Sequence, residues 1–381
     1  MTTTFDLAVV GGGIAGLAHA HAAARLGKRV VVIDREPQLT GASVRGYGLG
    51  LLTGQQRGIS WQRALRSREI LLEIARETGI AVDPRGLMTV ALRPEGLGLF
   101  ESYQATEMGE DCQILTAAAA RKRLPALKGD GVLGALWSPH ELRYDPRTFA
   151  AAFARWLGEA HKVHFMRGVH VRSVFPSRID TSAGPVRADA VIVCPGEELL
   201  TLFAHRIAHY RLTRCRVQML RLAPGTRLRL PHAVQSDLGL LACPGFADLP
   251  EANDLAVRLM SERHEPGPPT VRMLAVQNAD RTVTVGDSRL TAPAPGPFVP
   301  SSGEGQILDE FDQLFDVPER MVIERWTGVH LVADRPLIID QPAGSLRLVI
   351  VTGSFGASAA FAIAEDVVAD LFGSVTAGAV R

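Results

Sequence analysis

Lysine is scarce in this chain of 381 residues. The basic residues number 41, but only four of them are lysines, and no lysine follows Lys162. The acidic residues number 40, so the formal net charge is +1. A chain with this balance has no overall field that would attract nucleic acid or an anionic membrane surface. We therefore expect neither nucleic acid nor a membrane as a partner.

Cysteine is also rare, and its few copies are scattered without a C-x-x-C pair: Cys112, Cys194, Cys215 and Cys243. This pattern favours buried thiols in a reducing compartment over a disulfide framework or a zinc site, and we expect no metal. No apolar run approaches the roughly 20 residues of a membrane span. Met1 to Thr4 are too few to form a signal peptide ahead of the first apolar run. These absences predict a soluble, cytoplasmic protein.

The strongest pattern is the first stretch, which reads FDLAVVGGGIAGLAHAHAAARLGKRVVVID from Phe5 to Asp34. An apolar run breaks into G-x-G-x-x-G, continues as an Ala-rich helix and returns as a second apolar run. Gly11 permits the tight turn, Gly13 lets the backbone approach a pyrophosphate, and Gly16 lets the helix pack on the strand. The helix N-terminus, at Ile14 and Ala15, would face the phosphates. Asp34 would accept hydrogen bonds from both hydroxyls of an adenosine ribose.

The motif by itself leaves alternatives open, since an α/β domain can have a tight βα turn without binding a nucleotide. The flanking strands and the acid at the correct distance favour a dinucleotide site. Asp34 argues against a ribose 2′-phosphate because two anions would meet there, although Arg35 stands beside it. FAD or NAD is favoured over NADP.

The stretch after Asp34, REPQLTGASVRGYGLGLLTGQQRG, is rich in glycine and has no clear period, which predicts a loop. A loop that leaves the carboxyl end of this strand lies in the crevice where such sheets bind ligands. It would place several residues there: Ala42, Ser43, Arg45, Tyr47 and Gly48. Arg45 could meet a phosphate or an acidic substrate, and the alternatives are a surface ion pair and a plain solvent loop.

The middle of the chain alternates helical and strand patterns. Helices are expected at 61–78, 98–110, 115–124, 146–159 and 305–315. Strands are expected at 87–92, 131–137, 163–165, 169–174, 179–181, 188–193, 216–222, 238–243, 257–261, 271–277 and 282–287. The strand-rich part from 211 to 289 predicts a mostly antiparallel sheet, and 290–302 is a Pro-rich linker. Val171 would pass an adenine, and Gly196 would permit close approach to a ligand.

The end of the chain repeats the pattern of its beginning, a strand followed by a glycine-bearing turn and a helix. An apolar strand over 346–352 runs into a glycine-bearing turn, followed by a long apolar helix from Ala357 to Leu371. The turn holds four residues: Gly353, Ser354, Phe355 and Gly356. A helix N-terminus aimed at a ligand is one reading. A terminal helix that only covers the sheet is the other.

Together these motifs resemble the FAD-dependent D-amino-acid oxidase superfamily, in the branch with glycine oxidase and sarcosine oxidase. The segments that carry the resemblance are GGGIAGL, VVVID, GASVRGYG, DPRTFAAAFARWL, GVHVRSV, ADAVIVCPG, DRPLIID and VTGSFGASAAF. GASVRGYGLGLLTGQ is most similar to a bacterial branch associated with phosphonate catabolism, whose members oxidise aminoethylphosphonate or its N-methylated form. Gly46 stands where that branch usually has Asn.

The resemblance implies an α/β fold with two domains. A Rossmann-like FAD-binding domain of glutathione-reductase type would be discontinuous, with residues 1–80, 145–210 and 320–381. An α+β substrate domain on a mostly antiparallel sheet would take 81–144 and 211–319. Gly48 and Leu49 would pass near the flavin N5, and the final helix would direct its N-terminus at the flavin N1 and C2 carbonyl. FAD would be held by Gly11, Gly13, Ile14, Ala15, Gly16, Asp34, Arg35, Ala42, Ser43, Val171, Gly196, Gly353, Ser354, Phe355, Gly356 and Ala357.

The resemblance also implies the reaction, which is hydride removal from the carbon that bears an amine, followed by hydrolysis of the imine. The substrate would be a small anionic amine such as 2-aminoethylphosphonate or its N-methyl form, with glycine, sarcosine or a D-amino acid as the alternative. Arg335 and Arg45 would pair with the anionic end, and His330, Tyr47 and Gln55 would be polar liners. His330 could assist deprotonation of the amine, or it could be a hydrogen-bonded core histidine.

Two departures from sarcosine oxidase sharpen these expectations. The segment ahead of DRPLIID offers Thr327 and no cysteine, so FAD should be bound non-covalently. No lysine is available after Lys162 to activate oxygen above the flavin, so either O2 or another electron acceptor remains open. A nicotinamide-dependent enzyme and a non-catalytic flavin-binding subunit are the competing classes. The sequence gives no indication of the oligomeric state.

Overall fold

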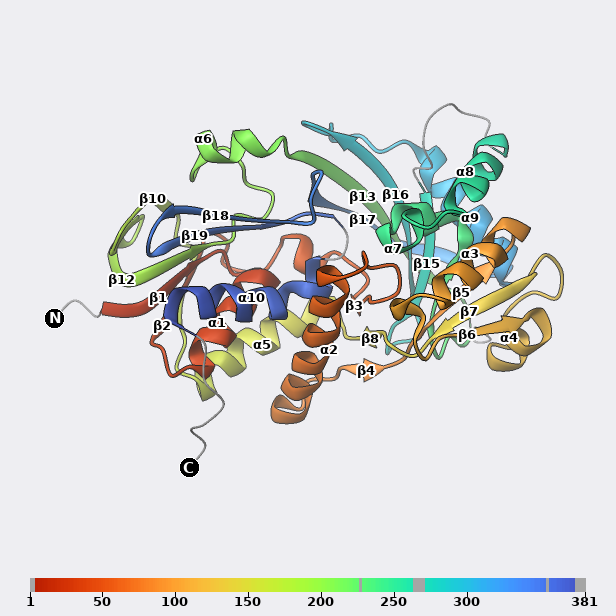
Figure 1. Ribbon diagram of the computed structural model, residues 1–381, viewed down its shortest axis with the longest axis horizontal. Helices are drawn as coiled ribbons and strands as arrows, with labels where there is room; N and C mark the ends of the chain where they lie inside the picture. Colours follow the sequence, from red (N-terminus) through yellow and green to blue (C-terminus); the bar gives the residue numbers. More distant parts are fainter. Residues whose placement is uncertain (1–3, 226–227, 263–270, 354–355, 374–381) are drawn as a thin grey trace.

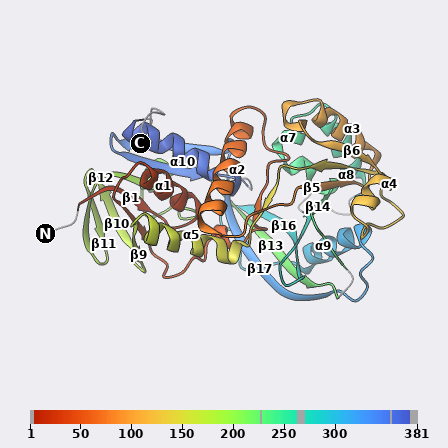
Figure 2. The same cartoon turned by 90° about the horizontal axis from the view of Figure 1, so that it is seen from below.

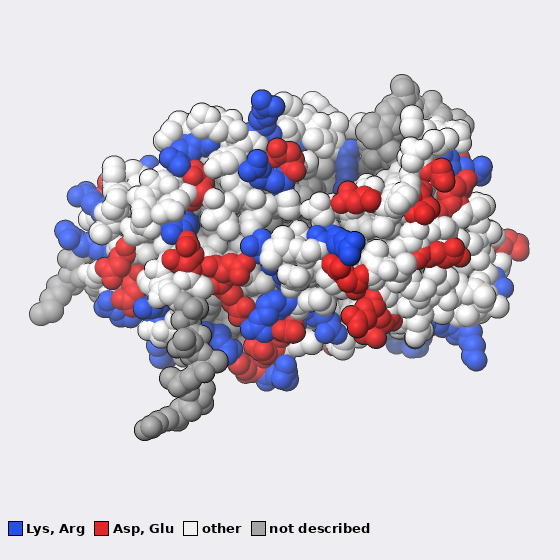
Figure 3. Space-filling model, in the orientation of Figure 1, with Lys and Arg blue, Asp and Glu red and all other residues white. Residues whose placement is uncertain are grey.

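The computed structural model describes residues 4–225, 228–262, 271–353 and 356–373. Its strands form two eight-stranded sheets and one small sheet of three strands. Figure 1 shows the two large sheets side by side, and Figure 2 shows α1, α5 and α10 grouped at one end of the molecule and α3, α4 and α9 at the other. Both kinds of charge are interspersed over the face drawn in Figure 3, in keeping with the small net charge.

The first sheet has a parallel centre. β1 (Thr4–Val10) lies between β12 (Gly184–Val193) and β2 (Val30–Asp34), and β9 (His164–Arg167) pairs with β2. β19 (Leu346–Val351) pairs in parallel with the other side of β12. The antiparallel strands of this sheet are β10 (Val171–Phe175), β11 (Arg178–Thr181) and β18 (Leu337–Ala343).

Helices cover one face of this sheet because its strands present alternate apolar side chains to each side. Leu7 and Val9 of β1 pack with the helices, whereas Ala8 and Val10 join the apolar cluster on the opposite face. The helices on the first face are α1 (Ile14–Arg25), α5 (Pro146–Ala160) and α10 (Gly356–Phe372), and α2 (Ile59–Thr78) packs against α10. This arrangement brings the first and last helices of the chain together beside β1.

The second sheet has the strand order β17-β13-β16-β15-β14-β5-β7-β6. Its pairs are antiparallel except β14 with β5, which confirms the expected mostly antiparallel sheet. The strands are β17 (Met321–Val332), β13 (Thr213–Ala223), β16 (Val283–Ala292), β15 (Val271–Gln277), β14 (Ala233–Ser236), β5 (Leu87–Ala91), β7 (Gly134–Ser138) and β6 (Gln113–Thr116).

The remaining helices and turns lie around the two large sheets. They are α3 (Pro94–Gln104), α4 (Ala117–Arg123), α6 (Ala204–Ile207), α7 (Pro244–Ala247), α8 (Ala252–Ser261), α9 (Ser301–Leu314) and the 3-10 turns η1 (Ala42–Val44), η2 (Glu107–Gly109), η3 (Ala208–Tyr210) and η4 (Asp237–Ala242). Of these, α6 and η3 lie on the first sheet, where Arg206 of α6 donates to Asp340 of β18. The small sheet joins β3 (Leu49–Gly50), β8 (Leu142–Arg143) and β4 (Asp83–Pro84). No helix in the described part of the chain is long and apolar enough to span a membrane.

The strand β17 bears on the proposed division into domains. Residues 321–332 pair with β13 in the second sheet, whereas β18 and β19 belong to the first. The proposed boundary at 320 therefore precedes a strand of the second sheet. The end of β17 nevertheless lies close to the first sheet. The amide of Gly353, just after β19, donates to the carbonyl oxygen of Leu331 in β17 at 2.6 Å.

Several local expectations were wrong. The expected strand at 238–243 is instead the 3-10 turn η4 with Cys243 as its C-cap, because the carboxylate of Asp237 accepts from the backbone amides of Leu92 and Arg93 and fixes the turn. Residues 257–261 belong to helix α8, whose buried residues Leu255 and Leu259 are four apart. The expected helix at 98–110 is α3 followed by the separate turn η2. Strands β6 and β14 had no counterpart among the expected elements.

Candidate active site

The glycine motif forms a tight junction between β1, β12 and α1. Gly11 has φ +103°, and a Cβ at this position would lie 2.2 Å from the carbonyl oxygen of Cys194 at the end of β12. A Cβ on Gly16 would lie 1.8 Å from the carbonyl oxygen of Gly11. Neither position has room for a side chain, so α1 begins directly at the carboxyl edge of the sheet. This places the positive end of the helix at the mouth of a cavity.

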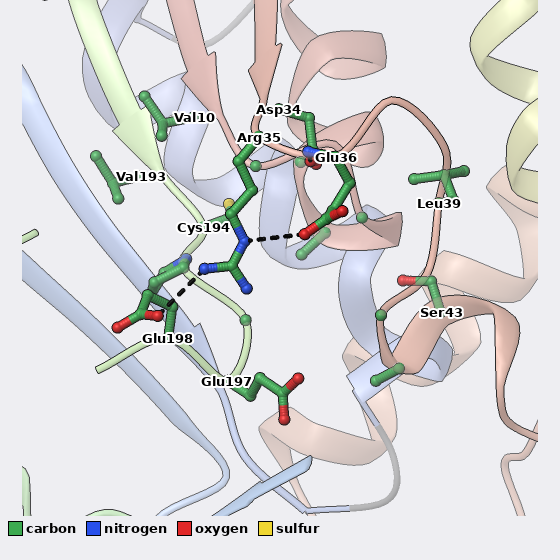
Figure 4. A pocket seen from close by; sticks show the side chains of 18 of the residues that line it. Val10, Asp34, Arg35, Glu36, Leu39, Ser43, Val193, Cys194, Glu197 and Glu198 are labelled. Atoms are coloured by element: carbon green, nitrogen blue, oxygen red, sulfur yellow. Dashed lines mark hydrogen bonds and ion pairs between the residues drawn. The ribbon is translucent and has the colours of Figure 1, made fainter. Parts of the chain in front are cut away.

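Two polar side chains fix the loops around this helix start. The Gly12 amide donates to Oδ2 of Asp34 at 2.5 Å, and the Glu36 amide donates to Oδ1 at 2.8 Å. The Ile14 amide, at the first residue of α1, donates to Oγ of Ser43 at 2.9 Å. Figure 4 shows Asp34 and Ser43 around the same pocket. Both residues were predicted as cofactor ligands, and both line this cavity.

The cavity, which we call the nucleotide channel, has a volume of about 460 Å³. It is lined by many of the residues predicted to hold the nucleotide: Gly11, Gly13, Ile14, Ala15, Gly16, Asp34, Arg35, Ala42, Ser43, Val171 and Gly196. Glu36 and Glu198 make part of its wall acidic. Both pair with Arg35, at 3.5 Å and 3.1 Å respectively (Figure 4). Because Arg35 is held by these carboxylates, the channel suits a free ribose better than a ribose 2′-phosphate.

A second cavity of about 240 Å³, the chamber, adjoins the channel. Residues on the walls of both include Ile14, Ser43, Arg45, Val329 and His330. The chamber is also lined by Gly48, Leu49, Gly353, Gly356 and Ala357, so the N-terminus of α10 and the loop before β3 meet there. Ser354 and Phe355 lie outside the described residues.

The channel and chamber together fit FAD. One compartment ends at the start of α1, and the other at the start of α10, so each has a helix N-terminus available to a negatively charged group. The backbone glycines at the first turn leave the close approach that a pyrophosphate requires. The two cavities share walls, so an extended dinucleotide can occupy both.

Three of the residues predicted to contact substrate meet at the chamber: Arg45, Tyr47 and His330. Arg45 donates from Nη1 to the carbonyl oxygen of Thr327 at 3.0 Å, which holds its side chain across β17. Burial lowers the pKa of His330 to about 4, with the nearby charge of Arg289 as a further cause. His330 is therefore a neutral imidazole at neutral pH.

The structure does not bring the other two predicted residues into the chamber. The side chain of Arg335 is 59% exposed, and its Nε lies 3.4 Å from Asp334. Gln55 is buried, but its Nε2 donates to the carbonyl oxygen of Leu51 at 2.8 Å. Neither residue is among the described residues that line the channel or the chamber.

The sequence prediction missed a buried ionic cluster on the chamber wall. Arg272 of β15 donates from Nη2 to Oδ2 of Asp287 at 2.9 Å, and Arg289 donates from Nε to Oδ1 of the same carboxylate at 2.5 Å. The Tyr47 hydroxyl lies 3.3 Å from Asp287 Oδ2. The sequence does contain a signal for this cluster. Arg272 is the single charged residue in the apolar strand Val271–Gln277, and a buried charge needs a partner.

Burial and neighbouring charges set the ionisation of this cluster. Burial alone would raise the pKa of Asp287, but the guanidinium groups of Arg272 and Arg289 hold it well below its usual value. Burial, and then the charge of Asp287, raise the pKa of Tyr47 well above its ordinary value. The cluster therefore holds a neutral phenol, one carboxylate and two guanidinium groups at neutral pH.

Comparison with known proteins identifies the family of the chain. The chain is 28% identical over 212 residues to the glycine oxidase of Geobacillus kaustophilus, and this match covers 51% of the chain and 55% of the relative, about half of its length. The crystal structure of glycine oxidase from the same organism superposes with a TM-score of 0.76 at 18% identity, covering 99% of this chain and 97% of that one.

The same fold occurs in the L-proline dehydrogenase of P. horikoshii, with a TM-score of 0.77 at 17% identity and coverage of 99% of this chain and 96% of that one. These likenesses confirm the predicted α/β architecture with its mixed sheets. Residues 6–371 match the DAO family, described as FAD dependent oxidoreductase. The chain therefore belongs to the DAO family of FAD-dependent oxidoreductases, and FAD is its cofactor.

Proposed function

We propose that this protein oxidises the C–N bond of a small anionic amine with its FAD. The observation that carries the proposal is the chamber, where buried Arg272 and neutral His330 lie on a wall shared with the N-terminus of α10. A guanidinium fork suits a carboxylate or a phosphonate. A neutral imidazole can accept a hydrogen bond from an amine without adding a competing positive charge.

The residues of the chain would bind and orient the substrate. Arg272, with Arg45 at the border of the channel, would hold the anionic end. Apolar side chains complete the wall and would exclude water: Leu49, Leu51, Val217, Met219 and Leu274. FAD supplies the hydride acceptor when it is bound. The N-terminus of α10 would stabilise the negative charge that reduction leaves on the cofactor.

Two substrate groups are candidates within this proposal. The loop GASVRGYGLGLLTGQ favours 2-aminoethylphosphonate or its N-methyl form. The second candidate is a carboxylate amine such as glycine, sarcosine or a D-amino acid, and the similarity to a glycine oxidase favours it. In either case the imine product would be hydrolysed to an aldehyde or a keto acid.

The binding mode of FAD and the electron acceptor belong to the same proposal. Thr327 is paired with Gln218 within the sheet, and no cysteine is among the described residues that line the chamber, so we infer that FAD is bound non-covalently. Oxygen or another acceptor would take the electrons. The chamber offers the arginines Arg45 and Arg272 as cations for this step.

Anaerobic reduction of the purified yellow protein tests the proposal. The panel consists of glycine, sarcosine, D-amino acids, 2-aminoethylphosphonate and N-methyl-2-aminoethylphosphonate. Loss of the flavin absorbance with at least one of these amines is expected, and the reducing member identifies the substrate group. A yellow protein that none of them reduces would contradict the proposal and favour a non-catalytic flavin-binding subunit. If only carboxylates reduce the flavin, the phosphonate candidate is rejected.

A further inference from the structure

The connection from β3 to α2 begins with residues 51–54, which we call the inner loop. All of its residues are buried. Loops usually run over the surface, because a buried loop carries backbone polar groups that need partners. In this loop the four successive backbone amides each donate to a side chain from elsewhere in the chain. Three side chains supply the acceptors: Ser358, Glu141 and Tyr103.

The amides of residues 52–54 are held from the side of the second sheet. Oε1 of Glu141, just before β8, accepts from the amides of Leu52 at 3.3 Å and Thr53 at 2.8 Å. The hydroxyl oxygen of Tyr103, on α3, accepts from the amide of Gly54 at 3.3 Å. Glu141 and Tyr103 are both 0% exposed, so packing fixes their positions. These contacts hold the inner loop in place relative to the second sheet.

The remaining acceptor comes from the first turn of α10. Oγ of Ser358 accepts from the amide of Leu51 at 2.8 Å, and Ser358 is 3% exposed. Leu51 lines the chamber, as do Gly356 and Ala357 at the start of α10. The hydrogen bond therefore joins two parts of the chamber wall. It also ties the start of α10 to a loop that is fixed on the second sheet.

A second serine makes the same kind of contact farther along α10. Oγ of Ser67, on α2, accepts from the amide of Ala362 at 2.9 Å, and Ser67 is 0% exposed. Figure 1 shows α2 beside α10. Ala362 lies about one helical turn beyond Ser358, and neither Ser67 nor Ala362 is among the described residues that line the channel or the chamber. Ser67 thus provides a matched comparison for Ser358.

We propose that Ser358 is a positioning residue for the flavin, because its hydroxyl fixes the N-terminus of α10 against the chamber. This inference rests on the proposed function, which places the flavin in the chamber beside α10. A helix N-terminus carries about half a positive charge, and its effect falls off within the first turn. A small displacement of α10 therefore weakens its stabilisation of the negative charge that reduction leaves on the cofactor. Loss of the Ser358 hydroxyl causes such a displacement, because the buried Leu51 amide must then find another partner.

The redox equilibrium of the bound flavin in the holoprotein tests this role. Wild type, Ser358→Ala and Ser67→Ala are equilibrated without oxygen against a redox dye of known potential, and the ratio of reduced to oxidised flavin is read from the absorbance. In Ser358→Ala the ratio should fall by about tenfold at the same dye potential, the order of a helix-terminus effect in a partly buried site. Ser67→Ala should keep the wild-type ratio. The melting temperature should fall in both variants, because each loses one buried acceptor.

A graded substitution strengthens the test. Ser358→Cys should give an intermediate ratio, because a thiol is a weaker acceptor than a hydroxyl. A wild-type ratio in Ser358→Ala would overturn the inference. An equal fall in Ser67→Ala would also overturn it, since general loosening of α10 would then be sufficient. If Ser358→Ala does not retain FAD, the ratio in Ser358→Cys decides in the same way.

This measurement uses no amine, so its failure and the failure of the proposed function are distinguishable. If an amine of the panel reduces the flavin but the ratio in Ser358→Ala equals that of the wild type, only the role of Ser358 is rejected. If the ratio falls as expected but no amine reduces the flavin, the role of Ser358 stands and the oxidation of amines is rejected.

Discussion

The Cβ position of Gly16 lies 1.8 Å from the carbonyl oxygen of Gly11, so these two glycines fix how closely α1 approaches the end of β1. Any side chain at position 16 would push the helix away from the strand. The N-terminus of α1 is part of the channel wall, so its displacement would also move the backbone that faces the nucleotide. We therefore expect packing of the first helix and cofactor binding to depend on the same contact.

Gly16→Ala should accordingly reduce both stability and FAD content. Overpacking of this kind costs about 1 to 3 kcal/mol, and the loss of bound cofactor adds to the fall in melting temperature. Gly41→Ala is a suitable control, because Gly41 lines the same channel with φ −78° and no atom lies within 4 Å of its Cβ position. The ratio of flavin to protein absorbance and a thermal melt measure both effects. Full FAD occupancy in Gly16→Ala would contradict the role of this contact.

A buried histidine should make the protein sensitive to mild acid. His21 lies in α1 among the rings of Phe153, Trp156 and Phe361, and its Nε2 has no hydrogen-bond partner among the described residues. Burial, with the nearby charge of Arg25, lowers its pKa to about 3. The unfolded chain binds a proton at His21 below about pH 6.5, whereas the folded chain does not. This contribution to stability is complete above pH 6.5 and is lost progressively as the pH falls toward 3.

The variant His21→Phe should therefore reduce the pH dependence of the unfolding free energy by about 1.4 kcal/mol per pH unit below about pH 6. Urea unfolding at about pH 7 and about pH 5 measures the difference. Phe361→Leu alters the same aromatic cluster without removing a titrating group, so it should lower stability at both pH values by similar amounts. An identical slope in His21→Phe and the wild type would rule out this explanation.

The extent to which the sequence predicted the structure differed between local and tertiary features. The glycine turn and α10 were predictable because backbone sterics and helical spacing act within a few residues. The apolar runs that became η4 and α8 were too short to show a period, and contacts from α3 and the second sheet decided their conformation. The pairing of Arg272 with Asp287 joins neighbouring strands across 15 positions of sequence, and no local pattern encodes it.

The residues predicted to contact substrate show the same difference between local and tertiary features. Arg45, Tyr47 and His330 were identified from their positions in motifs, and the fold brings them to one chamber. Arg335 was selected by its motif as well, but it follows the end of β17 at Val332 and turns to solvent beside Asp334. The direction of a side chain that follows a strand depends on the conformation of the next turn. The residue type alone does not reveal that conformation.

Reoxidation of the reduced protein by air should be slow. None of the four lysines is among the described residues that line the channel or the chamber, so an arginine must assist oxygen if oxygen reacts at all. Arg45 and Arg272 line the chamber, but Arg45 is held by the Thr327 carbonyl and Arg272 by Asp287. We therefore expect a soluble dye acceptor to reoxidise the flavin roughly 100-fold faster than air, the order of effect for a missing electrostatic stabiliser. Stopped-flow mixing of substrate-reduced protein with each acceptor measures the two rates. Rapid reoxidation by air would contradict the expectation.

The role of Arg272 as the cation for the anionic end is tested most directly by the effect of Arg272→Met on anaerobic flavin reduction by the best amine of the panel. We expect the substrate concentration for half-maximal reduction rate to rise by about 100-fold or more, because the anionic end loses its buried cation. Arg221→Met serves as the control, since Arg221 pairs with Asp280 and Glu324 outside the chamber lining, and it should behave as the wild type. Reduction of the flavin in Arg272→Met with an unchanged dependence on substrate concentration would show that Arg272 does not bind the anionic end.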